Sequence, residues 1–152
     1  MSVPVRDAST VVLVRDGEHG VETLMLHRPG RQSMGTLSFP GGVCETSDDE
    51  PLDWHGPTPA QWAHKVLSED IGRTRRSVVA AARKVFVETG ILLAGRDAFS
   101  VAEDPGGAEW GEVRQALDRQ EITLSEVLQQ HLAPLNIPAF QGGQFGHVAN
   151  QY

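Results

Sequence analysis

Lys84, Val87 and Glu88 are the residues of this chain whose types and spacing bear most directly on chemistry. Because they are three and four residues apart, their side chains fall on one face of a predicted helix. Upstream, a Pro-Gly-Gly turn contributes Gly41 and Gly42, and paired glycines let backbone carbonyls approach a ligand closely. The turn alone is a weak signal, and the helix face is the one on which chemistry is to be sought.

The helix that carries this face is predicted to run from Thr74 to Thr89. Thr74 or Ser77 can cap its start, and Gly90 stands where a left-handed C-terminal cap is wanted. Side chains at three- and four-residue spacing form a stripe that can pack on a sheet, namely Val78, Ala82, Val85 and Thr89. The stripe leaves the face with Lys84 available for a ligand.

A short helix is predicted between the glycine turn and the long helix. Thr58 has the character of an N-cap, Pro59 of a first helical residue and Gln61 of a capping-box partner. The helix continues from Trp62 to Leu67, and we expect Trp62 to pack in the core rather than to bind a ligand.

Two more helices are predicted towards the C-terminus. Residues 109–119 have a helical pattern, and Thr123 with Glu126 forms a capping box that opens a helix through His131. A hydrophobic staple of Ile122 against Val127 would fix the entry of the chain into that helix.

The composition favours one domain and disfavours several classes of partner. With 152 residues, 39% of them hydrophobic, and a formal charge of −7, the chain can form a single core but does not attract nucleic acid electrostatically. We find no charged-then-apolar leader in residues 1–10 and no apolar run near 18 residues, so neither secretion nor a membrane span is indicated. The sequence predicts a cytoplasmic protein.

Histidine, cysteine and a run of acids give weaker signals. The six histidines are scattered without the spacing of a zinc site. Cys44 lacks the basic neighbours that lower a thiol pKa, so a nucleophilic role is not expected. The acids of the loop after the turn, Glu45, Asp48, Asp49 and Glu50, are predicted to form a solvated surface, although they could supply metal ligands.

The glycine turn and the long helix together resemble the signature of the Nudix superfamily of diphosphate hydrolases. That signature has the form G-G-x5-E, a spacer, and R-E-U-x-E-E-x-G-U, in which U is aliphatic. Gly41 and Gly42 match its glycines, Arg83 its arginine, and Glu88 its last glutamate. Asp48 stands at the acidic position after five intervening residues.

Two positions of the signature differ, and its spacer is unusually long. Lys84 and Val87 replace two glutamates, whereas Val85, Gly90 and Ile91 match. Between the acidic position and the arginine lie 34 residues, so an insertion of about residues 49–73 interrupts the motif.

This insertion is similar to that of the coenzyme A diphosphatase-like branch of the superfamily. Members of that branch pair an F-P-G-G turn with an inserted segment containing Trp, which residues 57–67 match here. Residues 83–93 follow the helix of the branch, and Ala8 to Arg28 resembles its opening hairpin.

The resemblance implies an α/β fold, a Nudix-type α/β/α sandwich with a mixed sheet. Residues 1–138 would form the single domain, and residues 139–152, rich in Gly and Gln, a flexible tail. After Pro134 the resemblance ends, so we expect a sheet that is incomplete at the C-terminus. An incomplete sheet exposes an edge, which a homodimer would cover.

The resemblance also implies a site for Mg²⁺ or Mn²⁺, ions that prefer oxygen ligands and activate the attacking water. Three glutamates of the helix normally hold these ions, and here only Glu88 remains. The implied metal ligands are Glu88, the backbone carbonyl of Gly41, and Asp48. Glu88 and Arg83 occupy the catalytic positions, where the arginine orients neighbouring carboxylates.

Lys84 decides what chemistry this site can retain. A unit positive charge about 4 Å from another costs roughly 4 kcal/mol at an effective dielectric near 20, and a divalent ion feels about double. Metal binding should therefore be weakened. Lys84 could form an ordinary exposed pair with Glu88, or its ammonium could meet a phosphate directly. With Lys84, the implied substrate-binding residues are Arg28 and Gly42.

The predicted function is hydrolysis of nucleoside diphosphate-linked small molecules, with coenzyme A-like compounds first and then NADH and ADP-ribose. Activity dependent on Mg²⁺ or Mn²⁺ is expected to be weak or lost. The alternatives are a non-catalytic Nudix module that binds nucleotides or proteins, and a truncated remnant without activity. Neither nucleic acid nor a membrane is an expected partner.

Overall fold

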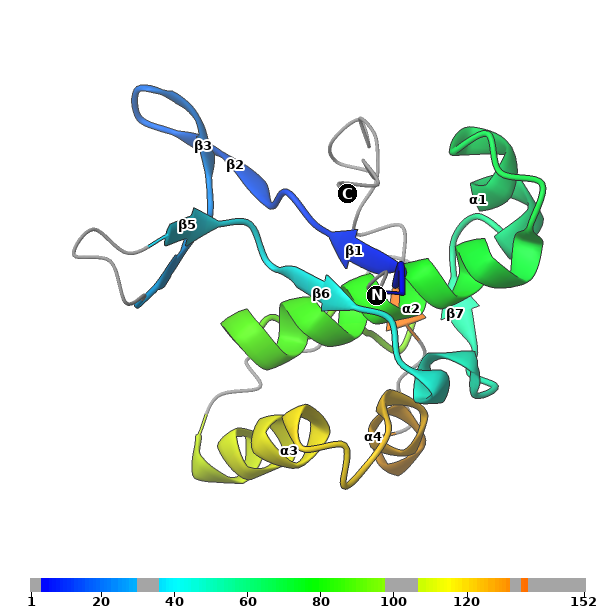
Figure 1. The fold of residues 1–152 in the computed structure, drawn as a ribbon. Coiled ribbons are helices and arrows are strands. Elements are labelled where there is room, and N and C mark those ends of the chain that lie inside the picture. The colour runs from blue at the N-terminus through cyan, green and yellow to red at the C-terminus, as the bar shows by residue number, and fades with distance from the viewer. Residues whose placement is uncertain (1–3, 30–35, 98–106, 132–134, 137–152) are drawn as a thin grey trace.

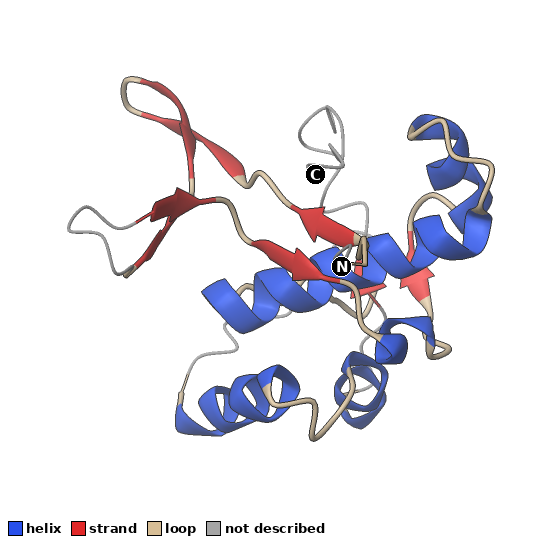
Figure 2. Cartoon of the chain, viewed as in Figure 1, coloured by secondary structure: helices blue, strands red, loops and turns tan. Residues whose placement is uncertain are grey.

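The computed structural model describes residues 4–29, 36–97, 107–131 and 135–136 (Figures 1 and 2). Its helices are η1 (Thr46–Asp49, 3₁₀), α1 (Pro59–Lys65), α2 (Ile71–Thr89), α3 (Ala108–Asp118) and α4 (Leu124–Gln130). Its strands are β1 (Ala8–Thr10), β2 (Val14–Gly17), β3 (Gly20–Thr23), β4 (Leu26–Arg28), β5 (Thr36–Ser38), β6 (Gly41–Val43), β7 (Trp54–His55) and β8 (Leu135–Asn136).

Helix α2 lies between two layers of the structure. Strands β1 and β6 lie on one side of it, and helices α3 and α4 lie on the other (Figure 1). Of the predicted stripe, Ala82 and Val85 are fully buried, whereas Val78 and Thr89 are half-buried. The buried surface is wider than that stripe because Phe86 also faces the core.

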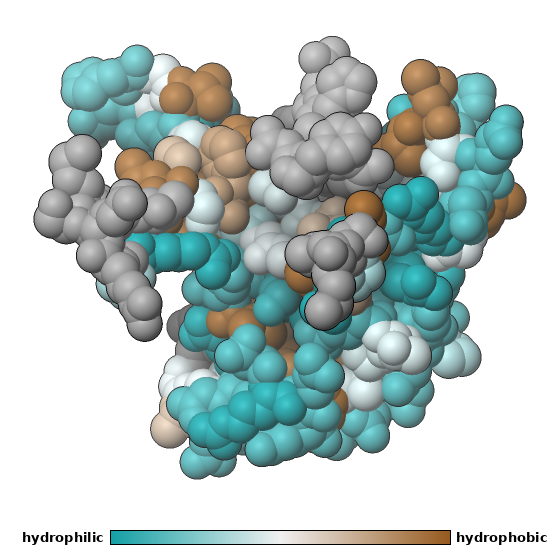
Figure 3. Space-filling model, viewed as in Figure 1, coloured by the Kyte–Doolittle hydropathy of each residue, from teal (hydrophilic) through white to brown (hydrophobic). Residues whose placement is uncertain are grey.

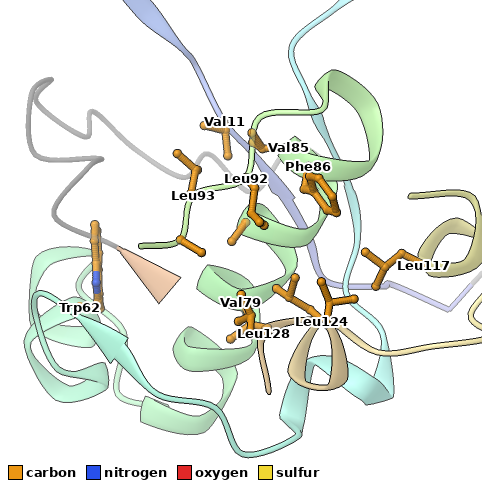
Figure 4. Packing of buried hydrophobic residues seen from close by; sticks show 13 residues of the cluster. Val11, Trp62, Val79, Val85, Phe86, Leu92, Leu93, Leu117, Leu124 and Leu128 are labelled. Atoms are coloured by element: carbon orange, nitrogen blue, oxygen red, sulfur yellow. The ribbon is translucent and has the colours of Figure 1, made fainter. Parts of the chain in front are cut away.

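The hydrophobic core gathers around α2 (Figure 4). Side chains from four helices and two loops contribute to it, including Val11, Trp62, Val79, Val85, Phe86, Leu92, Leu93, Leu117, Leu124, Val127 and Leu128. Trp62 is buried in this cluster, so the prediction that it packs is confirmed. Its position ties the insertion to the rest of the domain.

The start of α2 differs from the prediction, and its end agrees with it. The helix begins at Ile71, because the Asp70 carboxylate accepts a hydrogen bond from the Arg73 amide at 2.8 Å and caps the first turn. Caps at Thr74 or Ser77 were therefore wrong. Gly90 has φ of 79° and ends the helix in the predicted left-handed conformation.

The shorter helices largely follow their predicted caps. Thr58 and Gln61 form the capping box of α1, and Thr123 and Glu126 form that of α4. Helix α1 ends two residues before the predicted Leu67, which has a left-handed φ of 55°.

The strands form four separate pairs among the described residues. β1–β6, β2–β3 and β4–β5 are antiparallel, and β7–β8 is parallel. A mixed α/β composition is thereby confirmed. The sandwich with one mixed sheet stays a prediction, as do the domain limits. The tail at residues 139–152 lies outside the described residues.

Close backbone approach makes glycine necessary at one strand position. A Cβ on Gly41 would lie 2.3 Å from the Ser9 carbonyl oxygen, where β6 pairs with β1. The Ser9 hydroxyl donates to the Ser77 carbonyl of α2 at 2.7 Å. These contacts fix the Pro-Gly-Gly segment against the long helix. The predicted turn was wrong for Gly41 and Gly42, which are extended and pair with β1; the segment keeps the name glycine turn below.

Apolar side chains are exposed around the β2–β3 hairpin, as Figure 3 shows on this side of the molecule. They include Val12, Val14, Val21 and Leu24. The predicted homodimer stays a prediction. Within the described residues, none of the helices has the length and apolar character needed to cross a membrane.

Two glycines of the helical layer should respond to alanine in opposite directions. Gly90→Ala should lower the free energy of unfolding by at least about 1 kcal/mol, since an L-residue there is strained and its Cβ would lie 3.2 Å from Arg114 Nη1. Gly111→Ala, inside α3 and facing open space, should raise it by about 0.5–1 kcal/mol. Urea unfolding measures both changes. Equal effects would contradict the assigned backbone conformations.

Candidate functional site

Glu88 connects the end of α2 to two strands, β4 through Arg28 and β6 through Gly41. One carboxylate oxygen accepts a hydrogen bond from Arg28 Nη2 at 2.5 Å, and the other accepts one from the Gly41 amide at 2.9 Å. The Glu88 side chain is only 14% exposed, so this pair is partly shielded from solvent. Both oxygens of the one remaining motif glutamate are thus already bonded.

Arg28 is held in place by the strand pair from which it projects. It ends β4, and its Nε donates to the Ser38 hydroxyl of β5 at 2.8 Å. Ser38 immediately precedes the Phe-Pro-Gly-Gly sequence, so the same strand carries the turn and orients the guanidinium. These contacts bring Arg28 to the turn and to α2, and its predicted role in substrate binding stays a prediction.

Lys84 lies across the second glycine of the turn. A Cβ on Gly42 would be 2.6 Å from Lys84 Cε, so a larger residue there would require the lysine stem to shift. The ammonium lies 3.9 Å from Asp118 Oδ1 of α3. Within the described residues Lys84 and Glu88 do not pair with each other, so the predicted exposed pair on one helix was wrong.

Val87 stands where the Nudix signature has a glutamate. Its side chain contributes to packing, and its carbonyl takes part in capping the end of the helix. Its side chain packs against the core cluster, and its carbonyl accepts hydrogen bonds from Arg114 Nε and Nη2 at 3.2 and 2.9 Å. This carbonyl lies in the last turn of α2, where a cation complements the helix dipole. Arg114 therefore stabilises the helix end that presents Glu88.

Arg83 binds carboxylates of the acidic loop and holds this loop against α2. Its guanidinium donates to both carboxylate oxygens of Asp48, at 2.7 and 2.9 Å, and to Glu45 at 2.9 Å. Arg83 and Asp48 are each 1% exposed. The expectation of a solvated loop was therefore wrong for Asp48, which is buried because it neutralises a buried cation.

Burial and charge act in opposite directions on Arg83. Burial lowers the pKa of its guanidinium, but the hydrogen bond and charge of Asp48, together with the charge of Glu45, outweigh it and raise the pKa above its usual value. Arg83 consequently stays cationic in the fold. The orienting role that the Nudix resemblance implies for Arg83 stays a prediction.

The residues at this turn fit a hydrated divalent ion poorly. Asp48 is buried against Arg83, Val87 has no side-chain oxygen, and Lys84 brings a positive charge. The described residues contain no grouping of three or more His, Cys, Asp or Glu that could hold a metal. The roles of Glu88, Gly41 and Asp48 as metal ligands stay predictions.

Cys44, beside the acidic loop, is not an activated thiol. Burial raises the pKa of Cys44 above its ordinary value, and hydrogen bonds with Ser9 and Ser77 only partly oppose this effect. A raised pKa leaves little thiolate at neutral pH. The prediction that Cys44 lacks an activating environment is confirmed.

Helix α3 contributes residues that the sequence did not identify as part of the site. Trp110, Arg114, Leu117 and Asp118 recur at helical spacing along one face of α3 and contact or pack beside the end of α2. The sequence pattern predicted a helix over residues 109–119, but it contained no signal for the element against which the helix would pack.

Comparison of the chain with models of protein families, with curated proteins and with solved structures found no match. The assignment of a function therefore depends on the contacts of the site itself.

Neighbouring carboxylates of the acidic loop should differ in their contribution to stability. Asp48→Ala should lower the free energy of unfolding by about 3–5 kcal/mol, because it removes the closest partner of a buried guanidinium. Asp49→Ala, which breaks an exposed pair with Arg76, should lower it by at most about 1 kcal/mol. Chemical denaturation measures the two values, and similar values would contradict the burial of the Arg83–Asp48 pair.

Proposed function

We propose that this chain is a Nudix-type domain that binds nucleoside diphosphate-linked small molecules with little or no metal-dependent hydrolysis. Its strand pairs and helices would correspond to the α/β/α sandwich of that superfamily, with a coenzyme A diphosphatase-like insertion. Ligand candidates are coenzyme A-like compounds, NADH and ADP-ribose.

The single observation that carries this proposal is the set of contacts around Glu88. In a hydrolase of this type the carboxylates of the helix face hold metal ions, which in turn bind the diphosphate. Here the Glu88 carboxylate is paired with Arg28 and with the Gly41 amide. A guanidinium takes the place at which a cation would bind the carboxylate.

The cations that surround the turn support direct phosphate binding. Arg28 offers a planar guanidinium, which suits phosphate oxygens, and its side chain is half-exposed. Lys84 extends along Gly42 and ends in an ammonium, which binds phosphate as a point charge. Two cationic side chains from different elements flank one turn, and they could neutralise a diphosphate without a metal.

Weak or absent hydrolysis follows from the same arrangement. Asp48 and Glu88, the two acidic residues that match the signature, are both bonded to arginines, which disfavours their use as ligands of a water-activating metal. A bound diphosphate would therefore be recognised and retained. This makes the binding module a better account than the weakened hydrolase.

Calorimetric titration with ADP-ribose, coenzyme A and NADH, in buffer containing a metal chelator, tests the proposal. We expect at least one of these ligands to bind. Lys84→Ala should weaken that binding by about tenfold, the loss of one charge-assisted contact. Lys65→Ala provides a matched control, since Lys65 lies over the Trp62 ring on the insertion.

Hydrolysis measured with Mg²⁺ and Mn²⁺ separates the binding module from an enzyme. The unmodified chain should show little or no turnover of the ligands that it binds. Efficient turnover would contradict the proposal, and so would the absence of binding by a folded chain. A Lys84→Glu/Val87→Glu variant would show whether these two residues alone silence the site.

A further inference from the structure

We infer that Asp118 of α3 sets the ligand affinity of this site by competing with the phosphate groups for Lys84. This inference rests on the proposed function and adds a residue that determines affinity. No feature of the Nudix signature involves Asp118, which lies 34 residues beyond Lys84 in the chain.

The contact between Lys84 and Asp118 is weak enough for a phosphate to replace the Asp118 carboxylate. At 3.9 Å, the two charged atoms are too far apart for a direct hydrogen bond. The Asp118 side chain is 61% exposed, whereas that of Lys84 is 18% exposed. A pair of this length with one largely exposed partner is held by weak attraction, so a phosphate that carries more charge can replace the carboxylate.

Asp118 is nevertheless held at a fixed place. Leu117, its neighbour, is fully buried, and Trp110 packs edge-on against Phe86 with ring centroids 5.8 Å apart. Arg114 binds the Val87 carbonyl of α2. These three anchors fix α3 against α2, so Asp118 keeps its position beside α2 and its carboxylate is available to Lys84 when no ligand is bound.

The two cations of the site differ in how firmly they are held. Arg28 binds Glu88 at 2.5 Å and is oriented by Ser38, whereas among the described residues the charged partner of Lys84 is Asp118, at the longer distance of 3.9 Å. The stem of Lys84 already lies against Gly42. Its ammonium can therefore turn from Asp118 to a ligand at the glycine turn without moving its backbone, which makes Lys84 the first cation to exchange.

Titration of pyrophosphate in the presence of a metal chelator tests this competition. Asp118→Asn should raise the affinity about two- to fivefold, which corresponds to the free energy of an exposed ion pair. In the Lys84→Ala background the same substitution should change nothing. Glu121→Gln provides a matched control, because Glu121 forms a 3.9 Å exposed pair with Arg119 just beyond α3.

Lysine labelling adds a readout that needs no ligand. The chain contains two lysines, Lys65 and Lys84, so the ratio of their acylation rates is internally referenced. In Asp118→Asn, Lys84 should react about two- to fivefold faster relative to Lys65, because an ion-paired ammonium must leave its partner before it reacts. Glu121→Gln should leave the ratio unchanged.

The outcomes separate the inference from the proposed function. Binding by the unmodified chain with no gain in Asp118→Asn would overturn the inference and leave the proposed function intact. Faster labelling of Lys84 without pyrophosphate or nucleotide binding by any variant would overturn both, since the carboxylate would then compete with nothing. A gain in affinity that persists without Lys84 would also overturn the inference.

Discussion

The buried ion pair between Arg83 and Asp48 is the constraint on which the rest of the structure depends. It places a cation in the middle of α2 and draws the loop after the glycine turn onto the helix. Arg83 also bonds Glu45 and the Val43 carbonyl, so one guanidinium fixes the end of β6 as well as η1. Neither member of the pair could stay buried without the other, because an isolated charge is strongly disfavoured in the interior. The turn, the helix face and the start of the insertion are therefore held in one arrangement.

From this ion pair the candidate site extends along α2 towards the C-terminal end of the helix. Arg83 faces inwards, Lys84 lies over Gly42, and Glu88, one turn later, reaches Gly41 and Arg28. Helix α3 then fixes the end of α2 through Arg114. In the proposed Nudix-type domain this helix face would present paired charges where a hydrolase of that superfamily holds metal-binding carboxylates. Lys84 takes part in an ion pair and Val87 in packing.

Local signals in the sequence predicted local structure. The caps at Gly90, Thr58 and Thr123 depend on residues within one helical turn, and the structure has them as expected. The start of α2 was misplaced because Asp70 and Thr74 are both good N-caps, and only the structure shows that Asp70 binds the free amide.

Contacts between distant segments could not be predicted in the same way. Asp48 looked like a surface acid because its partner lies 35 residues away. Phosphorus NMR of ADP-ribose with the chain and Mg²⁺ tests most directly whether the site binds diphosphates without hydrolysing them. The account predicts shifted or broadened diphosphate signals that persist without product; new phosphomonoester signals, or spectra unchanged by the folded chain, would contradict it.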